Sequence, residues 1–263
     1  MLEIRTLEEQ IRKAGVESDD TVIIHTSLRS VGEVENGADG FIDSFKECLS
    51  DGLFLVPTFT YACVNKKQPY FNVKETKPCI GAVPTVAAFR PDGVRSLHPT
   101  HSVAAFGERR YDYVRDEIKT RTPTPPGGCM ARLYDEHAKI LLIGVGHNKN
   151  TFIHYIDELA DTPNRLGDER TYIDIDYDGK ELPHIMRPHF TPGTPDVSAN
   201  FVKFTDLLAR EGATHKAKLG NADVTVCDAV RLCDILCELF LRAKKLGIDL
   251  CKDGTPLDSL IKM

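Results

Sequence analysis

The sequence predicts an α/β protein: a three-layer α/β/α sandwich around a mostly parallel or mixed sheet, with a β-hairpin excursion outside the main layer. Strand-like runs followed by polar or glycine-bearing turns and then by helical spacing indicate strands that alternate with covering helices. Residues 172–177 alternate apolar and acidic side chains and precede Asp178-Gly179, which is a hairpin turn signal. No interdomain linker or internal repeat is evident, so residues 1–263 are expected to form one domain.

The elements are expected in the following order. Thr6-Leu7-Glu8-Glu9 matches a capping box and predicts a first helix that ends near Ala14. β-branched residues predict a strand at 21–26, and apolar residues at helical spacing predict a helix at 38–50. The remaining expectations are strands at 53–56, 101–106 and 140–143, helices at 83–90, 130–136, 201–210 and 226–245, and loops at 27–37 and 65–78.

Composition narrows the class of protein. The chain has 41% hydrophobic and 27% charged residues, which is ordinary for a globular protein. A net charge of −6 argues against nucleic acid as a partner and is compatible with a cationic ligand. No apolar run approaches the ~20 residues that a membrane-spanning helix needs. The charged N-terminal stretch has no signal-peptide core, so we expect a cytoplasmic protein.

The eight cysteines form no CxxC pair. Several stand beside apolar residues on helical patterns, as Cys48, Cys233 and Cys237 do. Reduced thiols that act as small hydrophobic side chains are therefore expected, rather than a disulfide framework or a zinc site.

The most informative segment is Lys139–Ala160, where an apolar strand leads through two glycines into a helix. Asn150 or Thr151 is expected to cap that helix, which places His154 in its first turn. Asp157 and Glu158 follow His154 by three and four residues, on the same helical face. A histidine with a carboxylate just past the carboxyl end of a core strand is typical of active sites in open α/β sheets. The alternative is a packed or solvated histidine with a surface carboxylate.

A second candidate is the polar segment 24–30, directly after the first strand. Its hydroxyls and backbone amides can cradle a phosphate, Arg29 can pair with one, and His25 can face the same cavity as His154. The segment is neither a P-loop nor a GxGxxG motif, and a simple Ser/Thr-rich turn is the alternative.

Two other loops carry reactive side chains. His98 and His101 have a spacing that two metal ligands can have, but no third ligand accompanies them, so a polar ligand-binding loop is the preferred interpretation. Cys129 follows a proline- and glycine-rich turn and is expected to be a buried thiol. The residues from 155 to 180 hold an excess of acids that is a candidate rim for a cation.

Four segments together resemble the antibiotic N-acetyltransferase family, which is typified by the aminoglycoside 3-N-acetyltransferases. The resemblance is strong over 21–160 and weak over 161–263. The four segments are VIIHTSLRSVG (22–32), LFLVPTFTY (53–61), GVRSLHPTHSVAAFG (93–107) and KILLIGVGHNKNTFIH (139–154).

This resemblance implies an α/β/α fold distinct from the histone-acetyltransferase-like one, with acetyl-coenzyme A as donor and an amine of a cationic aminocyclitol antibiotic as acceptor. It also implies catalysis by His154 with the aid of a carboxylate and without a metal. The family usually has Glu three residues after this histidine, where the present chain has Asp157 followed by Glu158. The coenzyme would lie against Ser27, Leu28, Arg29, Ser30, Thr100, Ser102 and Val103.

The predicted function is acetyl transfer from acetyl-coenzyme A to an aminoglycoside-type acceptor, at the 3-N position of 2-deoxystreptamine, as in antibiotic resistance. The attacking amine must be neutral, and a histidine with an ordinary pKa near ~6.5 is a suitable general base. The alternatives are a coenzyme A-binding protein, an N-acetyltransferase for a different amine, or a metal hydrolase that uses His25, His98 and His101. The predicted catalytic residues are His154, Asp157, Glu158 and His25, and the predicted acceptor-binding residues are Thr58, Tyr61, Asp157 and Asp168.

Overall fold

A seven-stranded mixed sheet forms the middle layer of the computed structural model, which describes residues 1–252, 257 and 260. The strand order is β4-β5-β2-β1-β6-β10-β9. The three central strands run parallel, and β5, β10 and β9 are each antiparallel to the neighbour nearer the centre. The strands are β1 (Thr21–Thr26), β2 (Leu53–Pro57), β4 (Val94–Arg95), β5 (Val103–Phe106), β6 (Lys139–Ile143), β9 (Thr214–Leu219) and β10 (Ala222–Asp228).

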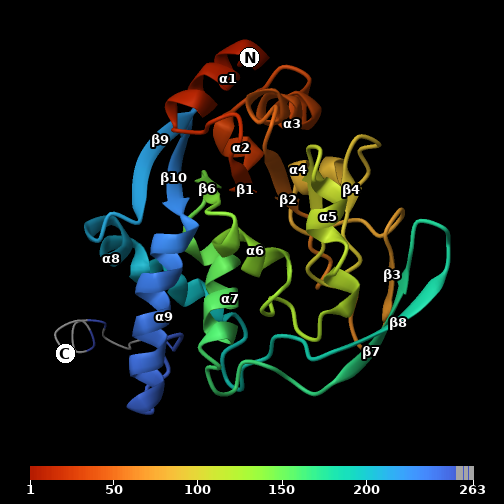
Figure 1. The fold of residues 1–263 in the computed structure, drawn as a ribbon, viewed down its shortest axis with the longest axis vertical. Coiled ribbons are helices and arrows are strands. Elements are labelled where there is room, and N and C mark those ends of the chain that lie inside the picture. Colours follow the sequence, from red (N-terminus) through yellow and green to blue (C-terminus); the bar gives the residue numbers. More distant parts are fainter. Residues whose placement is uncertain (253–256, 258–259, 261–263) are drawn as a thin grey trace.

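Helices cover both faces of this sheet, as Figure 1 shows. Successive strand side chains point to opposite faces, so Val22 and Ile24 pack in one apolar cluster and Ile23 packs in the other. The first cluster includes residues of α1 (Ile4–Lys13), α2 (Leu28–Val31), α3 (Gly37–Cys48) and α4 (Ala82–Ala87). The second includes residues of α5 (Arg110–Val114), α6 (Cys129–Asp135), α7 (Phe152–Leu159), η3 (Val197–Phe204), α8 (Thr205–Arg210) and α9 (Ala229–Lys245). The predicted three-layer class is therefore confirmed.

A smaller sheet lies beside this sandwich and contains the predicted hairpin. It consists of β3 (Tyr70–Asn72), β7 (Arg170–Ile175) and β8 (Glu181–Met186), seen at the right of Figure 1. Asp176 closes the turn, because its backbone N–H donates to the Lys180 carbonyl at 3.0 Å and its carboxylate accepts from the Lys180 N–H at 2.9 Å. The predicted loop at 65–78 is wrong where β3 forms, parallel to β7.

Two helix starts differ from the prediction. The first helix begins at Ile4 with Glu3 as its N-cap, so Thr6 lies inside the helix and the predicted capping box is wrong. The last helix begins at Ala229, after Asp228 has capped it by accepting the Arg231 N–H at 3.0 Å. Residue 226 belongs instead to β10. The prediction placed it in the helix because the apolar residues at the end of the strand and those in the first turn of the helix together fit one helical stripe.

All eight cysteines lie within the described residues and are free thiols. Five of them are buried, in keeping with a hydrophobic role, and Cys63 and Cys79 are exposed. Within the described residues, no helix is both long and apolar enough to cross a membrane.

Candidate active site

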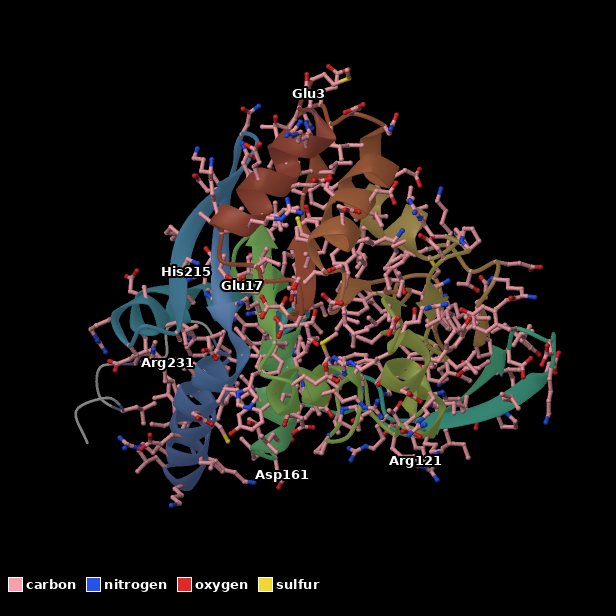
Figure 2. The ribbon with its side chains drawn as sticks, turned by 45° about the horizontal axis from the view of Figure 1, so that its top comes forward. Glu3, Glu17, Arg121, Asp161, His215 and Arg231 are labelled. Carbon is pink, nitrogen blue, oxygen red and sulfur yellow. The ribbon has the colours of Figure 1, made fainter. Side chains whose placement is uncertain are left out.

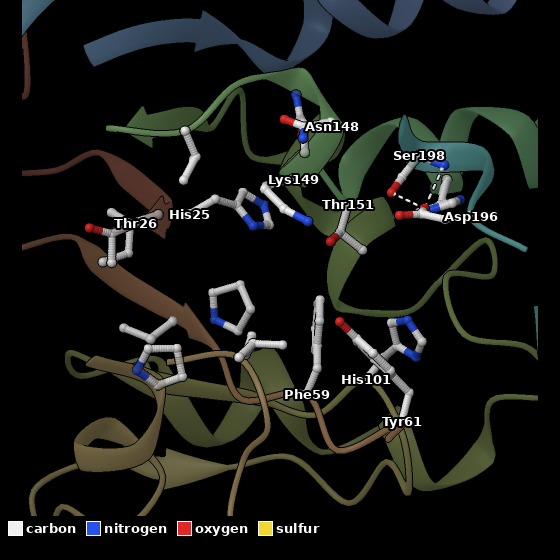
Figure 3. A pocket seen from close by; sticks show the side chains of 18 of the residues that line it. His25, Thr26, Phe59, Tyr61, His101, Asn148, Lys149, Thr151, Asp196 and Ser198 are labelled. Atoms are coloured by element: carbon white, nitrogen blue, oxygen red, sulfur yellow. Dashed lines mark hydrogen bonds between the residues drawn. The ribbon is translucent and has the colours of Figure 1, made fainter. Parts of the chain in front are cut away.

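A cavity of about 480 Å³ opens at the carboxyl ends of the three parallel strands. His25 and Thr26 reach it from β1, Phe59 follows β2, and Val145 follows β6. Because parallel strands end at the same edge of a sheet, three segments remote in sequence contribute to one wall. Figure 3 shows His25, Thr26 and Phe59 around a common space, together with the labelled residues Asn148, Lys149, Thr151, Asp196 and Ser198.

A second cavity of about 310 Å³ adjoins the first and shares part of its lining. It extends toward the smaller sheet, where Arg170, Tyr172 and His189 border it. The shared lining is Tyr61, His101, His154, Pro195 and Asp196. The predicted base His154 therefore stands where two cavities meet.

His154 lies half-buried in the first turn of α7, as the sequence predicts. The Asn150 side chain accepts the Phe152 N–H at 3.3 Å and so helps the helix to begin. The His154 ring packs on the rings of His189, with centroids 4.6 Å apart, and Phe201, with centroids 4.9 Å apart. Burial, followed by the positive charges of its neighbours, lowers the pKa of His154 well below its usual value, so this imidazole is neutral at pH 7.

The two carboxylates that follow His154 bind other partners. Asp157 is fully buried and accepts a 2.6 Å hydrogen bond from Nε of Arg165, which also bonds Asp249. Burial raises the pKa of Asp157 although Arg165 opposes the shift. Glu158 accepts from Nε2 of His189 at 2.6 Å. Among the described residues, neither carboxylate makes a hydrogen bond to His154.

His25 and Thr26 bring unsatisfied polar atoms to the larger cavity. His25 is buried, and burial lowers its pKa to about 3. Nε2 of His25 and Oγ1 of Thr26 are both buried and find no hydrogen-bond partner among the described residues. Because buried polar atoms are normally paired, these two atoms mark a place where a ligand or water completes the site.

The HPTHS segment is built around His98 rather than around a metal. Nδ1 of His98 accepts the backbone N–H groups of Thr100, at 3.2 Å, and His101, at 2.9 Å. Its Nε2 lies 3.3 Å from the Thr122 carbonyl oxygen, to which it donates. Both ring nitrogens are therefore engaged within the protein. The described residues contain no group of three or more metal-ligating side chains.

Several predicted site residues lie outside the two cavities. Ser102, Val103 and Thr58 are completely buried and line neither cavity. The Ser102 hydroxyl bonds the Thr58 hydroxyl at 2.9 Å and accepts from Nε of Arg95 at 3.1 Å. This buried guanidinium lacks a carboxylate partner among the described residues and is held by neutral oxygens, which is why the hydroxyls face inward. We correct the site by removing these three residues from the binding surface.

Among the remaining predicted coenzyme residues, those of 27–30 line neither cavity but directly follow Thr26, which lines the larger one. Ser27 and Ser30 share a 2.9 Å hydrogen bond between their hydroxyls at the start of α2, immediately after Thr26. Arg29 is exposed, and the half-buried Leu28 packs against the core. Thr100 lines the smaller cavity.

The acidic run does not form a rim around the cavities. Asp168 is exposed and lines neither cavity. Asp161 points outward beyond the end of α7 (Figure 2) and pairs with Lys244 at 2.8 Å. Asp174 is fully buried against His184. The acid that does line both cavities is Asp196, which the sequence analysis missed.

His189 was missed for the same reason as Asp196. Both lie beyond the region of strong resemblance, and no motif or spacing marks them. A possible signal was their position after the predicted hairpin, since a chain leaving a hairpin returns toward the main body. Tyr61, in contrast, was predicted and borders both cavities with half of its surface exposed.

The mixed sheet, its helix layers and a histidine-lined junction of two cavities define a three-layer α/β protein with a candidate site at the carboxyl ends of its parallel strands. The chain belongs to the aminoglycoside 3-N-acetyltransferase family, whose sequence model matches residues 23–240. Aminoglycoside N(3)-acetyltransferase IV of Salmonella sp is 29% identical over 155 residues, covering 59% of this chain and 58% of that protein. Aminoglycoside N(3)-acetyltransferase VIII of Streptomyces fradiae is 25% identical over 182 residues, covering 60% and 62% respectively. The match thus spans about three-fifths of the length of these relatives.

Solved structures share the fold. AAC-IIIb, in a binary complex with CoASH, has a TM-score of 0.79 at 16% identity and covers 97% of this chain and 99% of that chain. YokD from Bacillus subtilis has a TM-score of 0.78 at 17% identity, covering 93% and 95%. AAC(3)-IVa apoenzyme has a TM-score of 0.76 at 21% identity, covering 95% of each. These similarities agree with the family-specific fold that the sequence resemblance implies.

Proposed function

We propose that this protein transfers the acetyl group of acetyl-coenzyme A to an amine of an aminoglycoside-type acceptor, at the 3-N position of 2-deoxystreptamine. Family membership supports the reaction class. Similar structures carry CoASH, gentamicin or sisomicin in their names. The observation that carries the proposal is the position of His154, which lines both cavities and so can reach a donor in one and an acceptor in the other.

The larger cavity fits the donor. The unpaired atoms of His25 and Thr26 need partners, and a thioester with its amide-containing arm offers both donors and acceptors. The adjacent segment 27–30, at the start of α2, would hold the phosphate end, with exposed Arg29 as the charged partner. Acetyl-coenzyme A is here a co-substrate. Since it is a cytoplasmic metabolite, we also propose a cytoplasmic location.

The smaller cavity fits a cationic amine. Asp196 supplies a negative charge at the junction, and Tyr61 offers an exposed aromatic face to an ammonium group. Arg165 also lines this cavity, but Asp157 and Asp249 already neutralise it. A polycationic acceptor therefore meets one carboxylate directly, rather than an acidic rim.

His154 then has a defined part in the transfer. The amine nitrogen forms a bond to the acetyl carbonyl carbon, the carbon–sulfur bond breaks, and the proton leaving nitrogen passes to His154. The neutral state of His154 at pH 7 lets it accept this proton. Its protonated form can return the proton to the departing thiolate. Direct transfer in a ternary complex requires no acetylated side chain.

The test is release of coenzyme A thiol by the purified protein with acetyl-coenzyme A and a panel that includes gentamicin, sisomicin and simple amines. We expect thiol release that depends on an added aminoglycoside, with the acetylated product identified by mass spectrometry. Release without any amine would indicate a hydrolase, and a chelator that abolishes it would indicate a metal enzyme. Coenzyme binding without turnover would indicate a binding protein. Preference for a non-aminoglycoside amine would retain the chemistry and reject the proposed acceptor.

A further inference from the structure

One arginine of the smaller cavity has no partner within the protein. Arg170, the first residue of β7, is half-buried, and its side chain makes no hydrogen bond or ion pair among the described residues. Every other buried or half-buried arginine in the described part of the chain donates at least one hydrogen bond; these are Arg90, Arg95, Arg110, Arg132, Arg165 and Arg242. A guanidinium that is withdrawn from bulk water normally finds acceptors, so Arg170 marks a position that a ligand can complete.

The strand directs Arg170 into the smaller cavity. Arg170 and Tyr172 are two residues apart on β7, so their side chains share one face of the strand, and both line this cavity. Polar side chains that can form hydrogen bonds line the same space, namely Asn65, Thr100, Thr191 and Thr194. A guanidinium among such groups suits a phosphate or a carboxylate, because its N–H groups pair with the oxygens of either anion.

The cavity presents one negative and one positive group at separate positions. Besides the histidines, its charged lining residues are Arg165, Arg170 and Asp196, and Arg165 is already neutralised by its two aspartate partners. Asp196 accepts from the Ser198 N–H through Oδ1 at 3.0 Å and forms no ion pair with Arg170. A ligand that satisfies both charges therefore carries an ammonium and an anionic group.

The size of the cavity indicates a small molecule. Its volume of about 310 Å³ lies at the lower end of the ~300–1,000 Å³ range of ligand pockets, which suits a molecule of about one sugar ring. An aminoglycoside with several rings would have to extend beyond this cavity, whereas a compact amine with one anionic group would not.

We propose that the smaller cavity takes a second class of acceptor, a small amine that also carries a phosphate or carboxylate group, and that Arg170 binds this anionic group. Asp196 attracts the ammonium group of the same molecule toward His154. The reaction is the one described above: the nitrogen–carbon bond forms, the carbon–sulfur bond breaks, and the products are the N-acetyl compound, coenzyme A thiol and one proton. The anionic group only binds. This inference rests on the acetyltransferase function proposed above and adds an acceptor of different charge.

Three amino sugars separate the effect of the anionic group from that of the amine. Glucosamine 6-phosphate carries a phosphate, muramic acid carries a carboxylate, and glucosamine carries neither. Thiol release from acetyl-coenzyme A gives kcat/KM for each. For wild type we expect a kcat/KM for glucosamine 6-phosphate roughly 10- to 100-fold above that for glucosamine, because hydrogen bonds between two charged groups are the strong ones. A similar preference for muramic acid would extend the site to carboxylates, and its absence would restrict the site to phosphates.

Substitution of Arg170 tests its role directly. Arg170→Gln should lower the ratio of kcat/KM for glucosamine 6-phosphate to that for glucosamine to about 1, and Arg170→Lys should retain part of the preference. Arg170→Gln should also lower KM for sisomicin about two- to threefold, because a cation that repels ammonium groups is removed. A merely structural role would weaken the binding of both acceptors instead.

Arg121→Gln is the matched control. Arg121 is likewise without a side-chain partner among the described residues, but it is exposed and lines neither cavity (Figure 2). Its substitution removes the same charge and should leave the phosphate preference within about twofold of wild type.

The outcomes separate the two proposals. If wild type releases no thiol with any amine, the proposed function fails, and isothermal titration calorimetry decides whether the anion site exists: glucosamine 6-phosphate should bind wild type at least roughly 10-fold more tightly than Arg170→Gln. If wild type acetylates sisomicin but prefers neither anionic sugar to glucosamine, the second acceptor class alone is overturned. An unchanged preference in folded Arg170→Gln would overturn the role of Arg170. Thermal denaturation reports folding, and the wild-type ratio decides the question if the variant does not fold.

Discussion

Two histidine–carboxylate pairs of almost equal length occupy opposite environments in this molecule. His189 donates to Glu158 at 2.6 Å, and its side chain lines a cavity. His184 lies 2.7 Å from Asp174, its Nε2 lies 2.8 Å from the Thr120 carbonyl oxygen, and both members of the pair are fully buried. The contact within a pair therefore does not distinguish a chemical role from a structural one. The partner of the second ring nitrogen does.

The buried pair of His184 and Asp174 shows how the fold makes a histidine unavailable for catalysis. A carbonyl oxygen can only accept, so Nε2 of His184 must carry a hydrogen. One further proton lies between Nδ1 and Asp174, where burial raises the pKa of the carboxyl. Both ring nitrogens of His184 then have hydrogen-bond partners. Through these bonds the pair joins β7 and β8 to the segment before α6. It stabilises the position of the smaller sheet.

The largest expected effect is on the residue at the junction of the cavities. His154→Ala should lower kcat for sisomicin acetylation by roughly 100 to 10,000-fold, because the base that accepts the proton from the attacking amine nitrogen is lost. Circular dichroism and thermal unfolding should show an intact fold, since the imidazole makes no hydrogen bond within the described protein. Turnover within threefold of wild type in a folded variant would remove His154 from the mechanism.

Truncating each carboxylate separates the two pairs. Glu158→Ala should reduce kcat/KM about 10 to 100-fold at pH 7, because the cavity-lining His189 loses the carboxylate that orients its ring and fixes its tautomer. Asp174→Ala should instead lower the free energy of unfolding by about 2–3 kcal/mol, because it leaves a buried ring nitrogen unpaired. Steady-state kinetics and urea unfolding on both variants measure the contrast. Equal kinetic losses in the two variants would mean that the open and enclosed pairs do not differ in role.

Acid should destabilise the fold through its buried neutral histidines. Burial lowers the pKa of His25 and of His98 to about 3 and that of His147 to about 4, against an unfolded value near ~6.5. The unfolded chain binds protons first, so the stability is fully present above pH ~6.5 and falls as pH drops toward the folded values. Each group contributes at most about 1.4 kcal/mol per pH unit.

Unfolding in urea at pH 7.5 and 5.5 measures this effect. His147→Gln, which removes one of the three groups, should make the dependence shallower. A free energy of unfolding that is the same at both pH values would contradict the neutral, buried state of these side chains.

The smallest expected effects concern acceptor binding. Asp196→Asn should raise KM for sisomicin by about three- to tenfold, because the carboxylate lines both cavities and is only partly screened. Asp168→Asn is the control from the acidic run, and its exposed position outside the cavities predicts a change within about twofold. The reverse order of effects would restore the acidic run as the acceptor-binding surface.

The layered core and the placement of His154 were predictable because their signals are local. Apolar runs such as Ile140–Ile143 define buried strands, and glycines followed by a capped helix define the turn that carries the histidine. The outer hairpin β9–β10 was not predicted, because its exposed edge alternates polar and apolar residues without a long apolar run.

The partners of the site residues were not predictable, because they depend on contacts between distant segments. Glu158 and His189 are 31 residues apart and meet only because β7 and β8 return the chain to α7. Thr58 and Ser102 have suitable hydroxyls for a ligand, but the sequence does not show that Arg95 occupies them. The sequence therefore predicts which types of residue lie near the site, but it does not predict the direction in which their side chains point.

The most direct test of the central claim is a crystal structure of the protein with coenzyme A and sisomicin bound together. We expect the coenzyme in the larger cavity, with its phosphates near 27–30, and the aminoglycoside in the smaller one. The coenzyme sulfur and the acceptor nitrogen should meet beside His154, where the two cavities join. A sulfur atom remote from His154, or both ligands in a single cavity, would contradict the account.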